Sequence, residues 1–350
     1  MIAKTTKFLT SILILSCLVL SGNAFAFETD QYNLSPVPLA DIGPEFDEYL
    51  VATLDEVISE TNAEIDEIEN CLENKNVNCG KQRQMAERSD ELRSPDSIAK
   101  AVFKKLGDGT LPFTKVGTWI EKHEFRVAPA RFKTGYRESV HFAAPMNYLT
   151  ISPTINMYGT EFGTDKIAHI FQQGYDYYKI RAKAIDKNKT AEIGESEAVK
   201  FGRISEKTYF GTLVSAVYSN ADLAANFAGM RFYQQLTEEI KIGDRSFAPI
   251  LNLSEGRWVF NGNAKDLLKP YISNHLNEAY NPGKIYNIAG FRNNFREAVR
   301  KNACGDWSTR YPGLTAKDLE NKSAGLESWY GEEYGYSKSK DFVTIANTCF

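Results

Sequence analysis

Apolar residues recur at helical spacings near the start of the chain. Residues 45–73 place seven apolar side chains mostly three or four positions apart among many acidic residues, which predicts an amphipathic helix. These are Phe46, Leu50, Leu54, Val57, Ile58, Ile65 and Ile68. A break at residues 74–80 precedes a second polar helix, expected over residues 81–92. The pattern predicts an acidic helical hairpin that follows an extended leader at residues 27–44.

Helical signals continue through the rest of the chain. Ser94 before Pro95, and Gly107 twelve positions later, predict a short helix between them. Further helices are expected over residues 164–181, 208–233, 264–280 and 284–302, with a hairpin near residues 247–260. Residues 111–158 are irregular and rich in aromatic residues and proline. The predicted fold class is mainly α: a multi-helix globular domain with irregular aromatic-rich loops and the N-terminal helical hairpin.

The first 26 residues have the three parts of a secretory signal peptide. Lys4 and Lys7 precede an apolar run over residues 8–20, and small residues follow at residues 24–26. We expect cleavage before Phe27, and therefore a periplasmic or secreted protein. The alternative is a lipoprotein signal with lipid on Cys17. The expected organisation is a signal peptide at 1–26, the leader and hairpin at 27–93, and a main helical domain at 94–350.

The charge, the apolar stretches and the cysteines of the mature chain restrict its expected partners and compartment. Loss of Lys4 and Lys7 changes the formal net charge from −4 to −6, and no basic block follows, so nucleic acid is not expected as a partner. No later apolar stretch approaches the roughly 20 residues of a membrane-spanning helix. Four cysteines remain in an oxidising compartment, and we expect two disulfides, Cys71 with Cys79 and Cys304 with Cys349, although other pairings are possible.

Two of the expected helices carry unusual polar residues. On a helix over residues 164–181, Asp165 and His169 lie opposite the apolar face, so they face water if only one side is buried. On a helix over residues 208–233, a stripe of small and polar residues recurs at steps of four and three. Its members are Thr208, Thr212, Ser215, Ser219, Asp222, Asn226, Gly229 and Tyr233. A water-facing stripe would carry Lys and Glu, so this stripe is predicted to face inward.

A buried Asp222 needs a partner, because an isolated buried carboxylate is costly. The candidates are His169, Lys166, Glu206, Lys207, and the later pair His275 and Glu278. The alternative is that the small residues of the stripe only allow two helices to pack closely, with Asp222 and Asn226 bridging them.

Two short motifs in these helices resemble a known family. Asp165, Lys166 and His169 of "DKIAH", and Ser219, Asp222, Asn226 and Gly229 of "SNADLAANFAG", are similar to the motifs of the VanZ-like family of bacterial envelope proteins. Glu206 best matches the glutamate that the family carries between them, ahead of Glu195 and Glu197. The resemblance covers about 65 residues of the 350. It implies an envelope role without a defined reaction. The family's segments are membrane helices, whereas residues 177–210 are too polar for lipid.

These observations leave three functional hypotheses. The first is an envelope protein that binds a polar group of a lipid, glycan or peptide, with Lys166, Ser219, Asn226 and Gly229 as ligand-binding candidates. The second is a hydrolase, metal-dependent or not, with Asp165, His169, Glu206 and Asp222 as catalytic candidates. The third is a buried polar network that only fixes helix packing. No nucleophile or nucleotide-binding motif is present, which places binding or structure first. The sequence names no cofactor or metal.

The signal peptide gives a direct prediction for the mature chain. Mass spectrometry of the exported product is expected to find Phe27 at the N-terminus, because the cleavage site is clean. A chain that retains residues 1–26, or that carries acylated Cys17, would contradict it.

Overall fold

The computed structural model describes residues 28–73, 82–110, 113–143, 151–208, 211–287, 290–326, 328–329, 332–333 and 341–350. The expected signal peptide, Cys17, Phe27 and Cys79 lie outside these residues. Within them helices dominate and every sheet has two or three short strands, so the predicted mainly α class is confirmed. No helix in this part of the chain is both long and apolar enough to cross a membrane.

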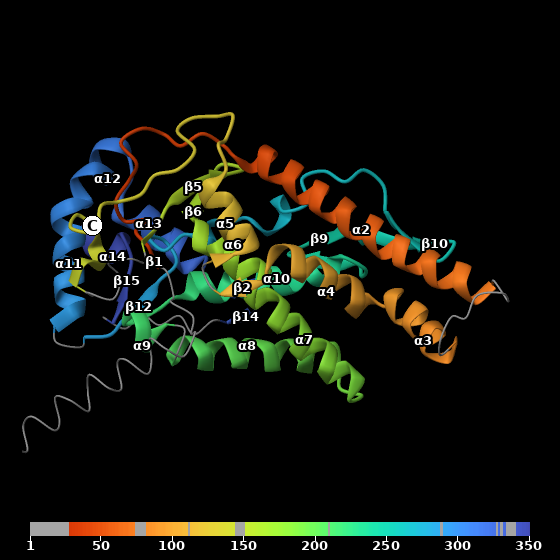
Figure 1. Cartoon of the computed structure of the whole chain (residues 1–350). Helices are drawn as coiled ribbons and strands as arrows, with labels where there is room; N and C mark the ends of the chain where they lie inside the picture. Colours follow the sequence, from red (N-terminus) through yellow and green to blue (C-terminus); the bar gives the residue numbers. More distant parts are fainter. Residues whose placement is uncertain are drawn as a thin grey trace, which may run out of the picture.

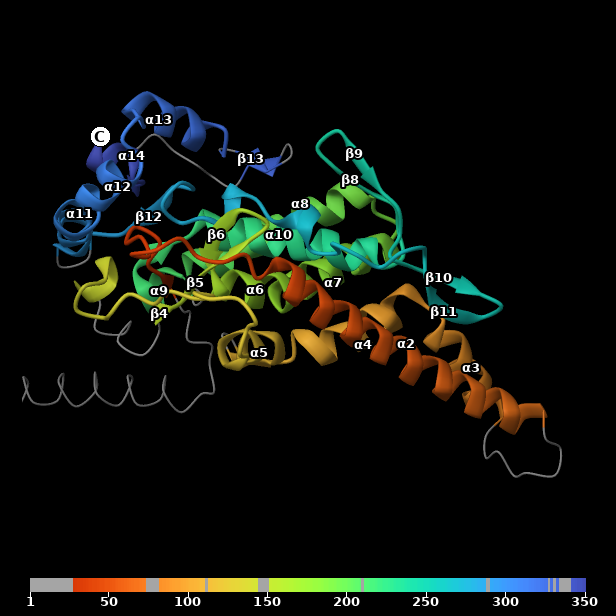
Figure 2. The same cartoon turned by 90° about the horizontal axis from the view of Figure 1, so that it is seen from above.

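The N-terminal helices form one end of the molecule. Strand β1 (Glu28–Thr29) leads to helices α2 (Gly43–Glu73), α3 (Gln82–Leu92) and α4 (Pro95–Leu106). All seven apolar residues expected on the inner face of α2 are buried. Ser94 caps α4 by accepting a hydrogen bond from Ser97 N, as its start signal predicts. Helices α2 and α3 project beyond the central helices in both views (Figures 1 and 2).

The centre of the fold is built around one buried helix, α10 (Asn220–Gln235). Before it the chain forms β2 (Gly109–Thr110), β3 (Phe113–Thr114), α5 (Lys115–Lys122), β4 (Ile151–Ser152), β5 (Thr154–Met157), β6 (Thr160–Gly163), α6 (Thr164–Phe171), α7 (Gln173–Asp186), α8 (Ala191–Lys207), α9 (Thr212–Ser215) and β7 (Val217–Tyr218). Helices α6, α7 and α8 pack against α10 (Figure 2). Strand β1 pairs in parallel with β4, which brings the N-terminal segment onto this centre.

The chain after α10 contributes to both ends of the molecule (Figure 1). It contains β8 (Ile240–Ile242), β9 (Arg245–Phe247), β10 (Leu251–Ser254), β11 (Arg257–Phe260), the short 3-10 helices η3 (Lys269–Tyr271) and η4 (Asn274–Leu276), β12 (Gly283–Ile285), α11 (Phe291–Asn302), α12 (Cys304–Arg310), α13 (Ala316–Ala324), β13 (Ser328–Trp329), β14 (Glu332–Glu333), β15 (Phe342–Val343) and α14 (Ala346–Cys349). Strand β12 lies between β15 and β7. The hairpin β10–β11 is the one expected near residues 247–260.

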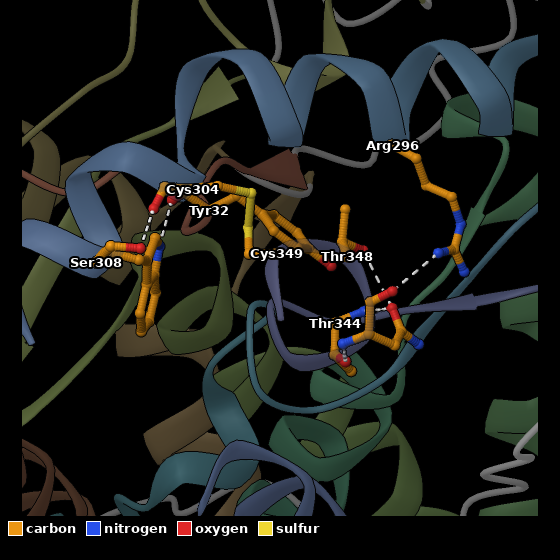
Figure 3. The surroundings of a disulfide bond; sticks show 9 residues. Tyr32, Arg296, Cys304, Ser308, Thr344, Thr348 and Cys349 are labelled. Carbon is orange, nitrogen blue, oxygen red and sulfur yellow. Dashed lines mark hydrogen bonds between the residues drawn. A yellow bond between two sulfur atoms is a disulfide. The ribbon is translucent and has the colours of Figure 1, made fainter. Parts of the chain in front are cut away.

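One of the two expected disulfides is confirmed. Cys304, at the start of α12, is bonded to Cys349 at the end of α14, with 5.2 Å between their Cα atoms. Figure 3 shows the Tyr32 side chain beside this bond, and its hydroxyl donates to Val343 O. The bond therefore ties the C-terminus to α12, and the Tyr32 contact ties the N-terminal segment to β15. The Cys71–Cys79 pairing involves a residue outside the described ranges.

The two central helices differ from their predicted extents. The helix expected over 164–181 consists of α6 and α7, which meet at Gln172. The helix expected over 208–233 is wrong in its first half. Ala216 adopts a left-handed conformation with φ of 61°, strand β7 follows, and Ser219 then caps a new helix. Pairing of β7 with β12 overrides the helical spacing, which no local pattern reveals.

Two later helix predictions also need correction. Residues 264–280 form the short η3 and η4 turns instead of a continuous helix. Residues 284–302 begin as strand β12, and α11 starts only after Gly290, which has a φ of 82°. η4 packs against α10 and β6, and β12 pairs with β7 and β15. These tertiary contacts, and not the local helical spacing, determine the backbone conformation of both segments.

A close crossing of α7 and α10 explains one small residue of the predicted stripe. A Cβ atom at Gly229 would lie 2.0 Å from Ile170 O and 2.8 Å from Gly174 Cα. A Cβ atom at Gly174 would lie 2.5 Å from Gly229 Cα. Both helices therefore approach through backbone contacts that only glycine permits.

We predict that Gly229→Ala destabilises the protein by about 1–3 kcal/mol or more, because the added methyl forces backbone atoms apart. Chemical denaturation measures the loss. The control is Gly305→Ala on α12, where a Cβ meets no atom within 4 Å. That substitution should be neutral or stabilise by up to about 1 kcal/mol through helix propensity. Equal effects of the two changes would contradict the close crossing.

Candidate functional site

The centre of the candidate site is a lysine with no exposed surface. Lys166 Nζ lies 2.6 Å from Asp165 Oδ2, 2.5 Å from Asp222 Oδ1 and 2.6 Å from Glu278 Oε1. All three acids are buried as well. We call these four residues the Lys166 cluster. One ammonium therefore contacts carboxylates from three parts of the chain.

Local structure places each member of the Lys166 cluster. Asp165 and Lys166 lie in the first turn of α6, and Asp222 lies in the first turn of α10, where a carboxylate suits the helix dipole. Ser219 caps α10 by accepting a hydrogen bond from Asp222 N at 3.0 Å. Glu278 follows η4, in the loop that leads to β12. The starts of the two helices therefore meet at the ammonium.

A second layer of hydrogen bonds fixes these carboxylates. Thr29 Oγ1 donates to Asp165 Oδ1 at 2.6 Å, and Ser219 Oγ donates to Glu278 Oε1 at 2.7 Å. Ser219 also uses its backbone N to donate to Glu206 Oε1 at 2.9 Å. Each carboxylate of the layer thus has a donor, as burial of charged groups requires.

His169 approaches Asp222 at Oδ2, whereas Lys166 contacts Oδ1 of the same carboxylate. Its Nε2 is 3.6 Å from Asp222 Oδ2, and its Nδ1 is 3.0 Å from Asn226 Oδ1. Asn226 Nδ2 donates to Gln173 Oε1 at 2.9 Å, which leaves Asn226 Oδ1 as an acceptor. With this orientation of the Asn226 amide, Nδ1 of His169 donates the hydrogen bond to Asn226 Oδ1. The imidazole is oriented by one amide, and its Nε2 faces Asp222.

Burial and charge act in opposite directions on these groups. Burial works against ionisation of Asp222, but the positive charges of His169 and Lys166 hold its pKa below the usual value. Burial would also lower the pKa of Lys166, yet Asp165, Asp222 and Glu278 together raise it well above the usual range. The charged form of Lys166 is therefore favoured, and a neutral amine nucleophile is disfavoured there.

Three acids near the ammonium, Glu28, Glu206 and Glu278, differ from Asp222 in the direction of their pKa shifts. Burial, reinforced by the charge of Asp222, raises the pKa of Glu28 and of Glu206 well above the usual range. Burial raises the pKa of Glu278 to about 7, although Lys166 opposes the shift. The site holds more acids than cations, and it accommodates the excess by favouring protonated carboxyls.

Most residues expected from the sequence come together here. Those that meet in the site are Asp165, Lys166, His169, Glu206, Ser219, Asp222 and Asn226. Gly229 instead lies at the helix crossing and offers no side chain. The expectation that Asp165 and His169 face water on a half-buried helix is wrong, because every residue of α6 is buried.

Some site residues were missed by the motifs. Glu28, Thr29 and Gln31 come from the segment expected to be an extended leader, and only the pairing of β1 with β4 brings them here. No sequence signal marks them. Gln173 lies four positions after His169, a spacing that places both side chains on one face of a helix, and both contact Asn226. This spacing could have identified Gln173 from the sequence.

The other histidines are used elsewhere. His275 and Glu278 lie three positions apart in the helix expected over residues 264–280, but no α-helix spans them. His275 Nδ1 contacts Ser273 Oγ at 3.0 Å, while Glu278 reaches Lys166. His123 contacts Glu45 Oε1 at 2.7 Å and stacks on Trp119. His141 is buried, and burial lowers its pKa.

The donor set of the Lys166 cluster has some character of a metal site. Oxygens of Asp165, Asp222 and Glu278 lie within 4.8 Å of one another, and three carboxylates suit a hard divalent cation. The Lys166 ammonium, however, contacts all three carboxylates. A cation held by the same three oxygens requires Lys166 to move away.

The raised pKa of Glu278 predicts a pH dependence of stability. A carboxyl with a folded pKa of about 7 and an unfolded pKa near 4.5 stabilises the fold most when protonated. That contribution is lost as pH rises from about 4.5 to about 7, by on the order of 3 kcal/mol. Glu278→Gln should therefore reduce the fall in unfolding free energy between about pH 5 and about pH 8, a range that covers most of this transition. Chemical denaturation at the two pH values measures the effect.

Glu28 and Glu206 contribute in the same direction, so the difference between wild type and variant isolates Glu278. Glu73→Gln, at an exposed position of α2, serves as the control and should leave the pH profile unchanged. A Glu278→Gln profile parallel to that of wild type would show that Glu278 does not titrate in this window.

No protein-family model matches the chain, and the searches of curated proteins and of solved structures found no similar protein. The comparisons therefore lend no support to the VanZ-like resemblance, which depends on two short motifs. The functional conclusion has to come from the geometry of the site.

Proposed function

We propose that the protein is an exported envelope protein of the binding class, in which the Lys166 cluster is a buried scaffold and not a catalytic centre. Its ligand is a polar group of an envelope lipid, glycan or peptide. The cluster fixes the segments that carry the binding surface.

The observation that carries this proposal is the position of Lys166 Nζ. The ammonium lies within 2.6 Å of an oxygen of Asp165, Asp222 and Glu278, so it fills the space that a catalytic cation would need. Its raised pKa keeps it charged and bound to these oxygens. One oxygen of each of these three carboxylates is therefore already occupied by a cation of the chain itself.

The burial of His169 also favours a structural role for the cluster over a catalytic one. A general base has to come within hydrogen-bond reach of a substrate proton. His169 is 3% exposed and Asp222 is 4% exposed, and both ring nitrogens of His169 face protein groups. The groups with suitable chemistry are committed to one another.

The proposed export and location have two supports. The first 26 residues have the pattern of a secretory signal peptide. The disulfide between Cys304 and Cys349 is of the kind that persists in oxidising compartments such as the periplasm. We therefore place the protein in the periplasm or outside the cell.

A hydrolase, possibly metal-dependent, is the second candidate function. It is favoured by the three converging carboxylates and by the approach of His169 to Asp222. It requires Lys166 to leave the carboxylates before a metal or a substrate can enter.

Metal analysis of the purified protein, with Asp222→Asn as the variant, tests the proposal. We expect no stoichiometric zinc, iron or manganese in wild type, and no change of melting temperature with manganese or zinc. Asp222→Asn should lose about 2–4 kcal/mol of unfolding free energy, because Lys166 loses one buried charged partner.

The control is Glu48→Gln, which removes an exposed partner of Arg126 and should leave the unfolding free energy nearly unchanged, because solvent screens this pair. Stoichiometric metal in wild type that is lost in Asp222→Asn would support the hydrolase instead. A metal-free Asp222→Asn protein as stable as wild type would contradict the scaffold role.

A further inference from the structure

A polar cleft lies beside the Lys166 cluster and is separate from it. Its volume is about 330 Å³, near the lower end of the roughly 300–1,000 Å³ typical of small-ligand sites. The N-terminal segment, the β5–β6 hairpin, the loop around η4, helix α12 and one residue of α13 line it. Gln31 belongs to both places, since it lines the cleft and its Oε1 accepts a hydrogen bond from Glu278 N.

Three residues of the cleft carry buried polar atoms without a hydrogen-bond partner in the protein. They are Gln31 Nε2, Thr154 Oγ1 and Asn156 Oδ1. Gln31 is 3% exposed and Thr154 is 5% exposed. Buried polar groups are normally paired, so these atoms indicate a place for a partner from outside the chain.

The side-chain amides of Gln31 and Asn156 are each oriented by a hydrogen bond at the atom that is not free. Gln31 uses its Oε1 to accept from Glu278 N, and Asn156 uses its Nδ2 to donate to Leu39 O at 3.0 Å. This leaves one donor, one acceptor and the Thr154 hydroxyl, which can act as either. A ligand that both donates and accepts through neighbouring hydroxyls fits this set.

Aromatic rings form another wall of the cleft. Trp307 is held by donation from its Nε1 to Tyr32 O, and the Tyr280 and Tyr311 rings lie 5.5 and 5.4 Å from it. Tyr311 is 37% exposed. A partly exposed ring on a fixed aromatic support offers an apolar face beside the polar atoms.

The charges of the cleft are nearly balanced. Glu161 and Lys322 are its only charged lining residues among those described. Burial raises the pKa of Glu161 and lowers the pKa of Lys322, so both charged forms are disfavoured. Lys322 Nζ also lies 3.6 Å from the centre of the Tyr280 ring. The cleft lacks the cluster of cations that a phosphate or other strong anion would need.

We infer that this cleft binds a neutral saccharide unit, whose hydroxyls pair with Gln31, Thr154 and Asn156 and whose apolar ring face packs on Tyr311. A sugar ring combines hydroxyl groups on its edge with C–H groups on its face, which matches the two kinds of wall. The inference rests on the binding class proposed above and specifies the ligand.

Calorimetric titration of the full chain with maltotriose, cellotriose and triacetylchitotriose tests this inference. Triglycine and inorganic phosphate are the comparison probes. We expect one-to-one binding of at least one trisaccharide. Thr154→Val should weaken it about tenfold, because the variant loses one hydrogen bond to the ligand.

The melting temperature of Thr154→Val separates a binding defect from a folding defect. Removal of an unpaired buried hydroxyl should leave stability unchanged or raise it, and valine suits strand β5. Thr134→Val is the matched control, since Thr134 is also buried with an unpaired hydroxyl but does not line the cleft. It should keep wild-type affinity. Tyr311→Ala should weaken binding by about tenfold as well.

Three results would overturn the inference: no trisaccharide binding at about 10 mM, binding of only triglycine or phosphate, or unchanged affinity in both Thr154→Val and Tyr311→Ala. Stoichiometric metal would refute the scaffold proposal without affecting this titration, so the two failures are distinguishable.

Discussion

The contact of one fully buried ammonium with three buried carboxylates is the constraint on which the rest of the structure depends. Removing these charges from water costs several kcal/mol per ion, and only close pairing with further hydrogen bonds offsets it. Lys166 supplies the pairing, while Thr29 and Ser219 supply the hydrogen bonds. The starts of α6 and α10, strand β1 and the loop at Glu278 must therefore keep one arrangement. A shift of any of them leaves a buried charge without its partner.

The excess of acids over cations gives this scaffold a second property. Lys166 carries one positive charge against the carboxyl groups of its three direct partners, and burial raises the pKa of Glu28 and Glu206 nearby as well. Protons take the role that further cations would otherwise fill. The same groups that hold the fold together thus make its stability depend on pH.

The scaffold and the cleft are joined through the N-terminal segment. Thr29 bonds the buried Asp165, and two residues later Gln31 bonds the backbone of Glu278 and lines the cleft. On the far side of the cleft, Trp307 bonds Tyr32 O, and the disulfide at Cys304 holds α12 to the C-terminus. Both walls are therefore fixed before a ligand arrives. Such preorganisation reduces the entropy that binding would otherwise cost.

The sequence by itself determined the elements whose signals are local. The spacing on α2, the Ser94 cap of α4 and the inward direction of Asp222 and Asn226 follow from side-chain periodicity and capping. Asp165, Lys166 and His169 also stand out in the sequence through the short motif "DKIAH", although the helical pattern placed Asp165 and His169 toward water. Local patterns could not supply the partners across the chain.

Only the tertiary structure decided how α9, β7 and α10 divide one apparent helix, because β7 pairs with a strand more than 60 residues later. It also decided that Glu28 and Glu278 join Lys166, since parallel pairing of β1 with β4 and a loop after η4 bring them there. Their distance along the chain hides these contacts from any pattern of neighbours. Burial then sets the charge of each acid, and burial is a property of the folded molecule alone.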